Sequence, residues 1–193
     1  MGELIGRERQ VVWQAWTGLS LETCRVIPVG EDVRAESVAL GVEAGTPWAV
    51  RYTVRCDNRW RTRQLSVESL HSDEAALTLL GDGAGRWTGT RGERLPLLDG
   101  CLDVDLTSTV LTNTLPIRRL ELVPGRSEEI TVVYVTVPGL TLSAARQRYH
   151  RLDGDGGRYR FEQVATGFSA EIAVDADGLV IEYPDIARRV WSR

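Results

Sequence analysis

The sequence predicts an all-β protein with few short helices, built as a large curved antiparallel sheet, an unclosed β-barrel or a β-roll. Apolar and polar residues alternate along 48–56, 168–174 and 179–183, which is typical of strands with one buried face. Asp-Gly and related turn pairs separate such segments at short intervals. Because a long antiparallel sheet must curl or close, we expect a concave apolar face.

Three other segments have their own patterns. The run 130–137 is apolar on both faces and predicts a central strand. Helical spacing is confined to two short segments, 143–147 and 185–190, so we expect the helices there.

Short motifs recur in the same order at a nearly constant offset of about half the chain, as Asp82-Gly83 and Asp177-Gly178 illustrate. This order predicts a duplication. At 193 residues we expect a single domain over 1–193 with internal repeat halves 1–97 and 98–193.

Composition excludes several classes of function. A net charge of −4 and a pI of about 5.3 argue against a nucleic-acid partner. No apolar run approaches the roughly 20 residues of a membrane helix, so we expect no integral membrane association. The first ten residues lack the apolar stretch of a secretory signal, and we expect a soluble, cytoplasmic protein. The sequence leaves the oligomeric state open.

Cysteine, lysine and histidine usage narrows the chemistry further. Cys24, Cys56 and Cys101 are widely spaced and form no CxxC motif, so we expect buried free thiols and no zinc site. All 23 basic residues are arginine, which removes a lysine nucleophile. With no phosphate-loop or metal motif present, we expect no cofactor and no metal.

The segment 99–120 carries the densest set of polar side chains between apolar neighbours. Unpaired polar groups are costly to bury, so this pattern predicts an ordered loop that satisfies its own hydrogen bonds. We expect Asp103 or Asp105 to pair with Arg118 or Arg119. We also expect Asn113 and Thr114 to bond backbone groups. The alternative is that one of the two aspartates acts as a general base.

Aromatic residues concentrate where a sheet that must curl would form a cavity. Core filling explains these rings, and the alternative is a lined cavity, because the rings offer flat apolar walls with a polar tip. Arginine guanidinium groups could hold an anionic head group. The candidate ligand-binding residues are Trp13, Trp48, Trp60, Arg63, Trp87, Asp103, Asp105, Asn113, Arg118, Arg119, Tyr149 and Tyr159.

Five sequence segments carry a resemblance to a known family: WRTR at 60–63, GCLDVDL at 100–106, TNTLPIRRL at 112–120, Gln147–Tyr149 and VDADGLVIEYP at 174–184. Together they resemble a bacterial domain of unknown function described as "putative glycolipid-binding". The resemblance implies a curved antiparallel sheet like an unclosed barrel, similar to the periplasmic lipoprotein carriers. It also implies a lipid or glycolipid ligand and no catalytic residues.

Three hypotheses for function follow. The first is non-catalytic binding of a lipid or glycolipid in an aromatic-lined cavity of a curved β-sheet. The second is a hydrolase or isomerase that uses Asp103 or Asp105 as general base. The third gives the TNTLPIRRL loop a purely structural role. A binder should hold both aspartates in hydrogen bonds, whereas an enzyme should direct a carboxylate into a cleft.

Overall fold

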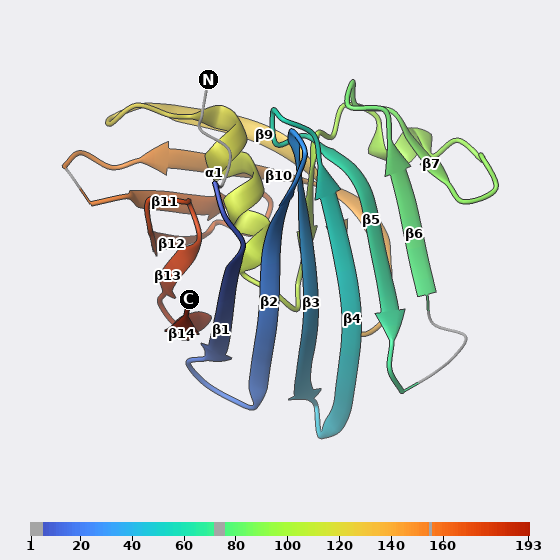
Figure 1. The fold of residues 1–193 in the computed structure, drawn as a ribbon, viewed down its shortest axis with the longest axis horizontal. Coiled ribbons are helices and arrows are strands. Elements are labelled where there is room, and N and C mark those ends of the chain that lie inside the picture. The colour runs from blue at the N-terminus through green and yellow to red at the C-terminus, as the bar shows by residue number, and fades with distance from the viewer. Residues whose placement is uncertain (1–5, 72–75, 155) are drawn as a thin grey trace.

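The computed structural model describes residues 6–71, 76–154 and 156–193, and these form one 14-stranded sheet (Figure 1). The described residues include a single α-helix, α1 (Thr114–Leu120), and two 3₁₀ turns, η1 (Pro96–Leu98) and η2 (Leu111–Asn113). The strands are β1 (Arg9–Ala15), β2 (Ser20–Val29), β3 (Asp32–Glu43), β4 (Thr46–Cys56), β5 (Thr62–Ser69), β6 (Ala76–Gly81), β7 (Trp87–Gly89), β8 (Asp103–Leu106), β9 (Ser127–Val135), β10 (Leu142–Arg151), β11 (Arg158–Gln163), β12 (Phe168–Val174), β13 (Val180–Tyr183) and β14 (Ala187–Ser192).

The sheet order is β7-β6-β5-β4-β3-β2-β1-β14-β13-β12-β11-β10-β9-β8. All neighbours are antiparallel except β8 and β9, which are parallel. The sheet curves strongly, and α1 lies between its front and back parts in Figure 1. Since β7 and β8 remain as ends of the order, the sheet is not closed into a barrel. The predicted fold class is therefore confirmed.

The chain passes from one end of the sheet order to the other between β7 and β8. Gly100 N–H donates to the Gly85 carbonyl (2.8 Å), and Thr62 N–H donates to the Leu102 carbonyl (2.9 Å). The Trp87 indole Nε1 donates to the Cys101 carbonyl (2.9 Å). These bonds tie residues 100–102 to the β5–β7 part of the sheet and so position β8 across the open side.

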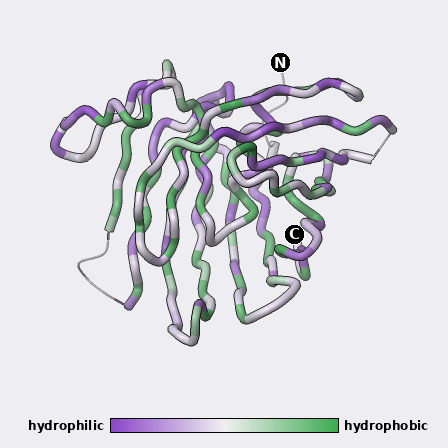
Figure 2. The backbone as a smooth tube through the Cα atoms, turned by 180° about the vertical axis from the view of Figure 1, so that it is seen from behind, coloured by the Kyte–Doolittle hydropathy of each residue, from purple (hydrophilic) through white to green (hydrophobic). Residues whose placement is uncertain are grey.

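The core lies on the concave face. Along β4 the predicted alternation holds, since Val50, Tyr52, Val54 and Cys56 are buried and Trp48 is half-buried. In Figure 2, which views the molecule from behind, hydrophilic and hydrophobic residues alternate along the strands. The buried residues of both halves of the chain join in one cluster, which includes Ile117 of α1.

The predicted helices were wrong, whereas the predicted strand over 130–137 lies for the most part in β9. Residues 143–147 lie in β10, and 185–190 form the β13–β14 turn and part of β14. The helix forms instead within 112–120, where Leu115, Pro116 and Ile117 are buried against the sheet. Strand β9 is second from the end of the sheet order, although it has a neighbour on each side. Short apolar runs do not separate helix from strand, and tertiary packing decides.

Asp82-Gly83 and Asp177-Gly178 both lie in hairpin turns, β6–β7 and β12–β13. Asp82 Oδ1 accepts hydrogen bonds from the backbone N–H groups of Ala84 and Arg86, two and four positions later in the chain. Asp175 Oδ1 accepts the equivalent two bonds, from Asp177 and Leu179. The equivalent aspartates are therefore Asp82 and Asp175, which shifts the predicted correspondence by two residues. The domain boundary and the duplicated halves stay predictions.

The β4–β5 turn repeats this hydrogen-bond pattern. Asp57 Oδ1 accepts the N–H groups of Arg59 (3.0 Å) and Arg61 (3.1 Å). At the fourth position, where the other two turns have Gly85 and Gly178 with positive φ, this turn has Trp60 with φ +61°.

Cys24, Cys56 and Cys101 are free and buried, as predicted. Burial raises the pKa of all three thiols, that of Cys101 to about 11. The thiolate is the reactive form.

We therefore expect the native protein at pH 8 to react negligibly with a thiol reagent on the timescale of a model thiol, and the denatured chain to titrate three thiols. The measurement is absorbance after addition of an aromatic disulfide, with and without denaturant and with air oxidation excluded. Rapid reaction of any thiol in the native state would contradict the burial.

Candidate functional site

Asp103 and Arg119 form a buried ion pair that joins β8 to the end of α1. Arg119 Nε lies 3.0 Å from both Asp103 carboxylate oxygens, and its Nη2 lies 2.6 Å from Oδ2. The side chain of Asp103 is 1% exposed and that of Arg119 is 15% exposed. Burial raises the pKa of Asp103, and the Arg119 guanidinium opposes this shift. One of the predicted aspartate–arginine pairings is thus confirmed.

Asp105, two residues further on, is held without a cation. Its Oδ1 accepts a hydrogen bond from the Thr112 hydroxyl (2.9 Å), and its Oδ2 accepts one from Gln147 Nε2 (2.6 Å). Burial raises the pKa of Asp105, and these two bonds oppose the shift. Both aspartates accept hydrogen bonds, as expected of a binding protein, and Asp105 also lines a pocket.

Of the other polar residues predicted to bond backbone groups in 99–120, one does and one does not. Asn113 is buried; its Nδ2 donates to the Val110 carbonyl (3.4 Å), as predicted, and its Oδ1 accepts from the Tyr149 hydroxyl (3.1 Å). Thr114 Oγ1 is buried and has no hydrogen-bond partner among the described residues, so the prediction for Thr114 was wrong. The segment is also not a loop throughout, because it contains β8, η2 and α1.

Sequence reasoning missed a third buried carboxyl, Glu22 on β2. Its Oε1 accepts hydrogen bonds from the hydroxyls of Tyr52 and Ser37, and Tyr52 Oη lies 3.0 Å from Thr109 Oγ1. Burial raises the pKa of Glu22, with these hydroxyls opposing the shift. The signal was present in the sequence, because Glu22 shares the inward face of β2 with Cys24 and Val26.

Two neighbouring pockets open at one end of the curved sheet, separated by the segment 107–110. The first, of about 280 Å³, is lined by Trp13, Trp48 and Glu22. The second, of about 350 Å³, is lined by Asp105, Asn113 and four aromatic residues. Ile186 and residues 107, 109 and 110 line both. The four aromatic residues of the second pocket are Tyr134, Phe161, Phe168 and Tyr183.

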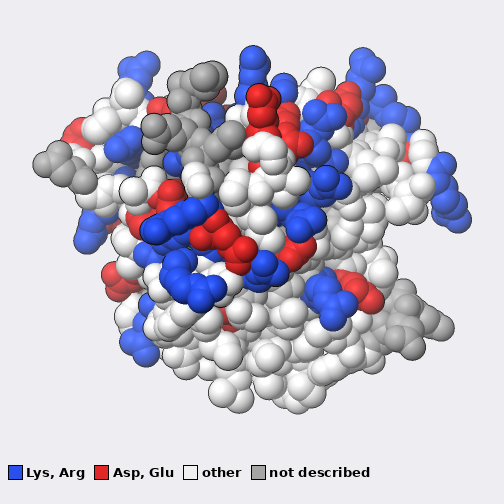
Figure 3. All heavy atoms as spheres, viewed as in Figure 1, with Lys and Arg blue, Asp and Glu red and all other residues white. Residues whose placement is uncertain are grey.

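We call this end of the molecule the mouth and define it by the six loops that line or flank these pockets: 16–19, 44–45, 107–110, 136–141, 164–167 and 184–186. Of the residues in these described loops, Asp185 alone is charged. Trp16, Leu19 and Ile186 are among their exposed apolar side chains. In Figure 3 the lower part of the molecule, where loops 16–19 and 44–45 lie, is almost free of charge.

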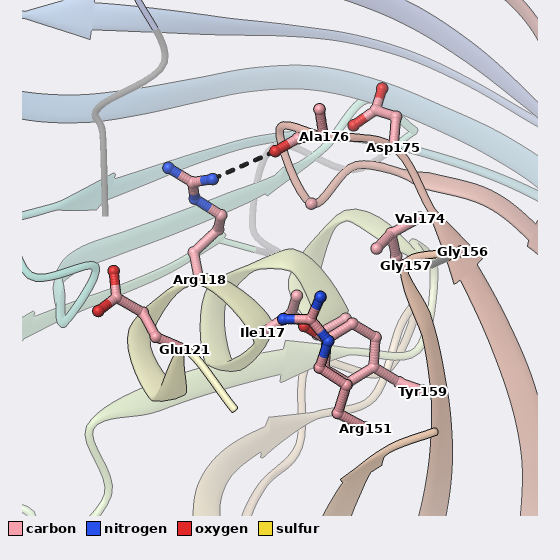
Figure 4. A pocket seen from close by; sticks show the side chains of 11 residues that line it. Ile117, Arg118, Glu121, Arg151, Gly156, Gly157, Tyr159, Val174, Asp175 and Ala176 are labelled. Atoms are coloured by element: carbon pink, nitrogen blue, oxygen red, sulfur yellow. Dashed lines mark hydrogen bonds between the residues drawn. The ribbon is translucent and has the colours of Figure 1, made fainter. Parts of the chain in front are cut away.

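The other ends of the strands carry charge instead. A pocket of about 600 Å³ lies there, and Figure 4 shows Arg118 from α1 and Arg151 from β10 on its walls. Arg118 Nη1 donates to the Ala176 carbonyl (3.4 Å), and the Arg151 guanidinium lies 5.9 Å from the Tyr159 ring centre. A second pocket, of about 380 Å³, is lined by Trp60, Arg118 and Arg119 together with Arg59 and Arg61.

The predicted site residues therefore do not form one site. Trp13, Trp48, Asp105 and Asn113 lie at the mouth, whereas Trp60, Arg118, Arg119 and Tyr159 lie at the charged end. Asp103, Tyr149 and Trp87 are buried and line none of these pockets. Arg63 is on the outer side of β5, where its Nε donates to the Gly81 carbonyl (3.0 Å). Whether any of them contacts a ligand stays a prediction.

Comparison with known proteins identifies the family. The family model described as "Putative glycolipid-binding" matches residues 10–189. The chain belongs to this family. The crystal structure of a DUF1089 family protein from Pseudomonas aeruginosa is similar to the chain at 34% sequence identity, covers 98% of both chains and has a TM-score of 0.78. A comparison with curated proteins found no match.

No group of three or more His, Cys, Asp or Glu side chains that could hold a metal ion occurs in the described part of the chain. No helix in that part is long and apolar enough to cross a membrane.

The Asp103–Arg119 pair generates a stability prediction. Asp103→Asn or Arg119→Gln leaves a buried partner without its counter-charge, and either change should lower the free energy of unfolding by about 3–5 kcal/mol. The double variant should recover part of this loss. A double-mutant cycle by urea unfolding measures the coupling, and additive losses would contradict the pairing.

Glu22 generates a pH prediction. Because its folded pKa is raised above 4.5, the folded protein keeps a proton that the unfolded chain loses between pH 4.5 and the folded pKa. In that window, rising pH should lower the free energy of unfolding by up to about 1.4 kcal/mol per pH unit from this group. Glu22→Gln should remove this dependence while still accepting from Tyr52 and Ser37. Parallel urea titrations across pH for both proteins test it; identical curves would contradict it.

Proposed function

We propose that the protein binds a glycolipid or a similar amphiphile without catalysis, with the acyl chain in the aromatic groove at the mouth. The groove is the 350 Å³ pocket between Tyr134 of β9, Phe161 of β11, Phe168 of β12 and Tyr183 of β13. The observation that carries the proposal is this row of aromatic side chains beside hydrogen-bonding groups on a concave sheet.

The aromatic part of the groove is well suited to an alkyl chain. The Phe161 ring centre lies 6.1 Å from that of Tyr183 and 6.4 Å from that of Phe168, so the rings form a continuous apolar wall. Burying alkyl carbons contributes roughly 0.8 kcal/mol per CH₂. The volume of about 350 Å³ falls at the lower end of the range of ligand pockets, which fits one chain rather than several.

The same groove also holds groups suited to a sugar. Asp105, Asn113 and Gln163 line it together with threonine hydroxyls at 107, 109 and 166. Such groups donate and accept hydrogen bonds without bringing a cation, which matches an uncharged head group rich in hydroxyls. The family described as "putative glycolipid-binding" supports the same ligand class.

The surroundings of the groove also favour an amphiphile. Exposed Leu19, Phe168 and Ile186 stand at the mouth, and the loops there are nearly without charge. Contiguous exposed apolar residues around a pocket are typical of a lipid-binding or docking region. A lipid could therefore enter the groove without passing a charged rim.

Calorimetric titration with dodecyl maltoside below its micellar concentration tests the proposal. We expect saturable binding by the wild-type protein and none of maltose alone, because the alkyl chain supplies most of the affinity. Ile186→Ser removes an apolar wall shared by both mouth pockets and should weaken binding about tenfold.

The matched control is Val123→Ser, which removes a 61% exposed apolar side chain at the charged end and should leave binding unchanged. No saturable heat with dodecyl maltoside, or an equal effect of the two substitutions, would count against the proposal. Native mass spectrometry of protein purified from its own host would then identify the natural ligand from its mass.

A further inference from the structure

Trp60 holds a backbone conformation that the two matching turns give to glycine. Its φ is +61°, compared with +87° for Gly85 and +78° for Gly178 at the same position of the same hydrogen-bonded turn. The left-handed region crowds Cβ against the following carbonyl, so a bulky side chain is strained there. Strain of this kind persists where the surrounding structure enforces it, and it concentrates at functional sites.

The strained tryptophan positions an arginine. The Arg118 guanidinium lies over the Trp60 ring, 5.3 Å from its centre. The Trp60 side chain is buried, and its Nε1 has no hydrogen-bond partner among the described residues. Both residues line the pocket of about 380 Å³ at the charged end, which we call the Trp60 pocket.

Two more arginines of the Trp60 pocket are fixed by carboxylates. Arg61 contacts Asp57 Oδ2 through Nε (2.9 Å) and Nη2 (2.8 Å), and Arg119 engages Asp103 through the same two nitrogens. This side-on geometry uses Nε and Nη2 and leaves the Nη1 donors of Arg61 and Arg119 with no hydrogen bond among the described residues. The remaining donors therefore have fixed directions.

We propose that the Trp60 pocket binds a doubly charged oxyanion, of the class of a phosphate monoester. Guanidinium groups recognise such oxyanions through charge-assisted hydrogen bonds, and donors held in place lose little entropy on binding. Four arginines and Glu121 line the pocket, and Asp57 and Asp103 pair with two of these arginines, so four cations against three carboxylates leave one net positive charge there although the whole chain is acidic. This site is separate from the amphiphile groove at the mouth.

Calorimetric titration with glycerol 3-phosphate, repeated with inorganic phosphate, tests the site. Arg59→Gln removes a cation from the pocket wall and should weaken binding about tenfold. Arg86→Gln is the control, because Arg86, like Arg59, is an exposed arginine in a turn with this hydrogen-bond pattern, and it lies outside the pocket. It should bind as the wild type does.

Asp57→Asn separates positioned donors from general attraction. Asparagine can still accept the N–H groups of Arg59 and Arg61, so the turn should survive, which thermal melting checks. The variant makes the pocket more positive but releases Arg61. Positioned donors therefore predict weaker binding, whereas diffuse electrostatics predicts tighter binding.

Competition distinguishes a lipid head group from a soluble ester. If phosphatidic acid vesicles capture the protein and glycerol 3-phosphate releases it, the oxyanion can belong to a lipid; if only the soluble ester binds, it belongs to a soluble molecule. Both results support the site. Absence of saturable binding at millimolar glycerol 3-phosphate, equal losses in Arg59→Gln and Arg86→Gln, or tighter binding by Asp57→Asn would overturn it.

Discussion

The interior of the curved sheet depends on the ion pair between Asp103 and Arg119. An unclosed sheet leaves a concave apolar face that water would reach unless something filled it, and here the filling is α1 with Leu115 and Ile117. A seven-residue helix is too short to be stable by itself. The bidentate contact from its last turn to β8 fixes both its depth and its direction. The arginine also lies at the helix C-terminus, where the macrodipole favours a cation. The segment 107–113 connects β8 to α1, so the Asp103–Arg119 pair also fixes the position of the loop that separates the two mouth pockets.

Much of the fold could be predicted from the sequence, because strand alternation and turn chemistry are local signals. The inward face of β4 and the three buried thiols follow directly from them. The helix at 114–120 could not be predicted in this way, since over so few residues its apolar positions match neither the repeat of a strand nor the repeat of a helix. The chain forms it because Leu115 and Ile117 can bury only inside the curve, which is a property of the whole sheet. The misplaced helix at 143–147 has the same cause, because pairing with β9 and β11 outweighs a short helical pattern.

The candidate site was harder to predict than the fold, because the sequence names residues but not the end of the sheet at which each lies. Trp48 and Trp60 are consecutive tryptophans in the sequence, yet they lie near opposite ends of β4 and line different pockets. Glu22 was detectable, since a carboxylate at an inward position of an apolar strand is conspicuous. The aromatic residues of the mouth groove were not, because they come from four separate strands and each fits a core position equally well.

The mouth and the charged end suit different ligands, because their carboxylates have different hydrogen-bond partners. At the mouth, Glu22 and Asp105 are buried with hydroxyl and amide donors alone, and burial raises the pKa of both. Such carboxyls favour neutral, hydrogen-bonding surroundings and disfavour an anion beside them. At the charged end, Asp57 pairs with Arg61 and Asp103 with Arg119, and these ion pairs fix the directions of the remaining guanidinium donors. Burial raises the pKa of Asp57, but the hydrogen bonds from Arg59 and Arg61 outweigh it and lower the pKa overall, so this carboxylate stays ionised. An uncharged sugar is thus compatible with the first end and an oxyanion with the second, and neither ligand class suits both.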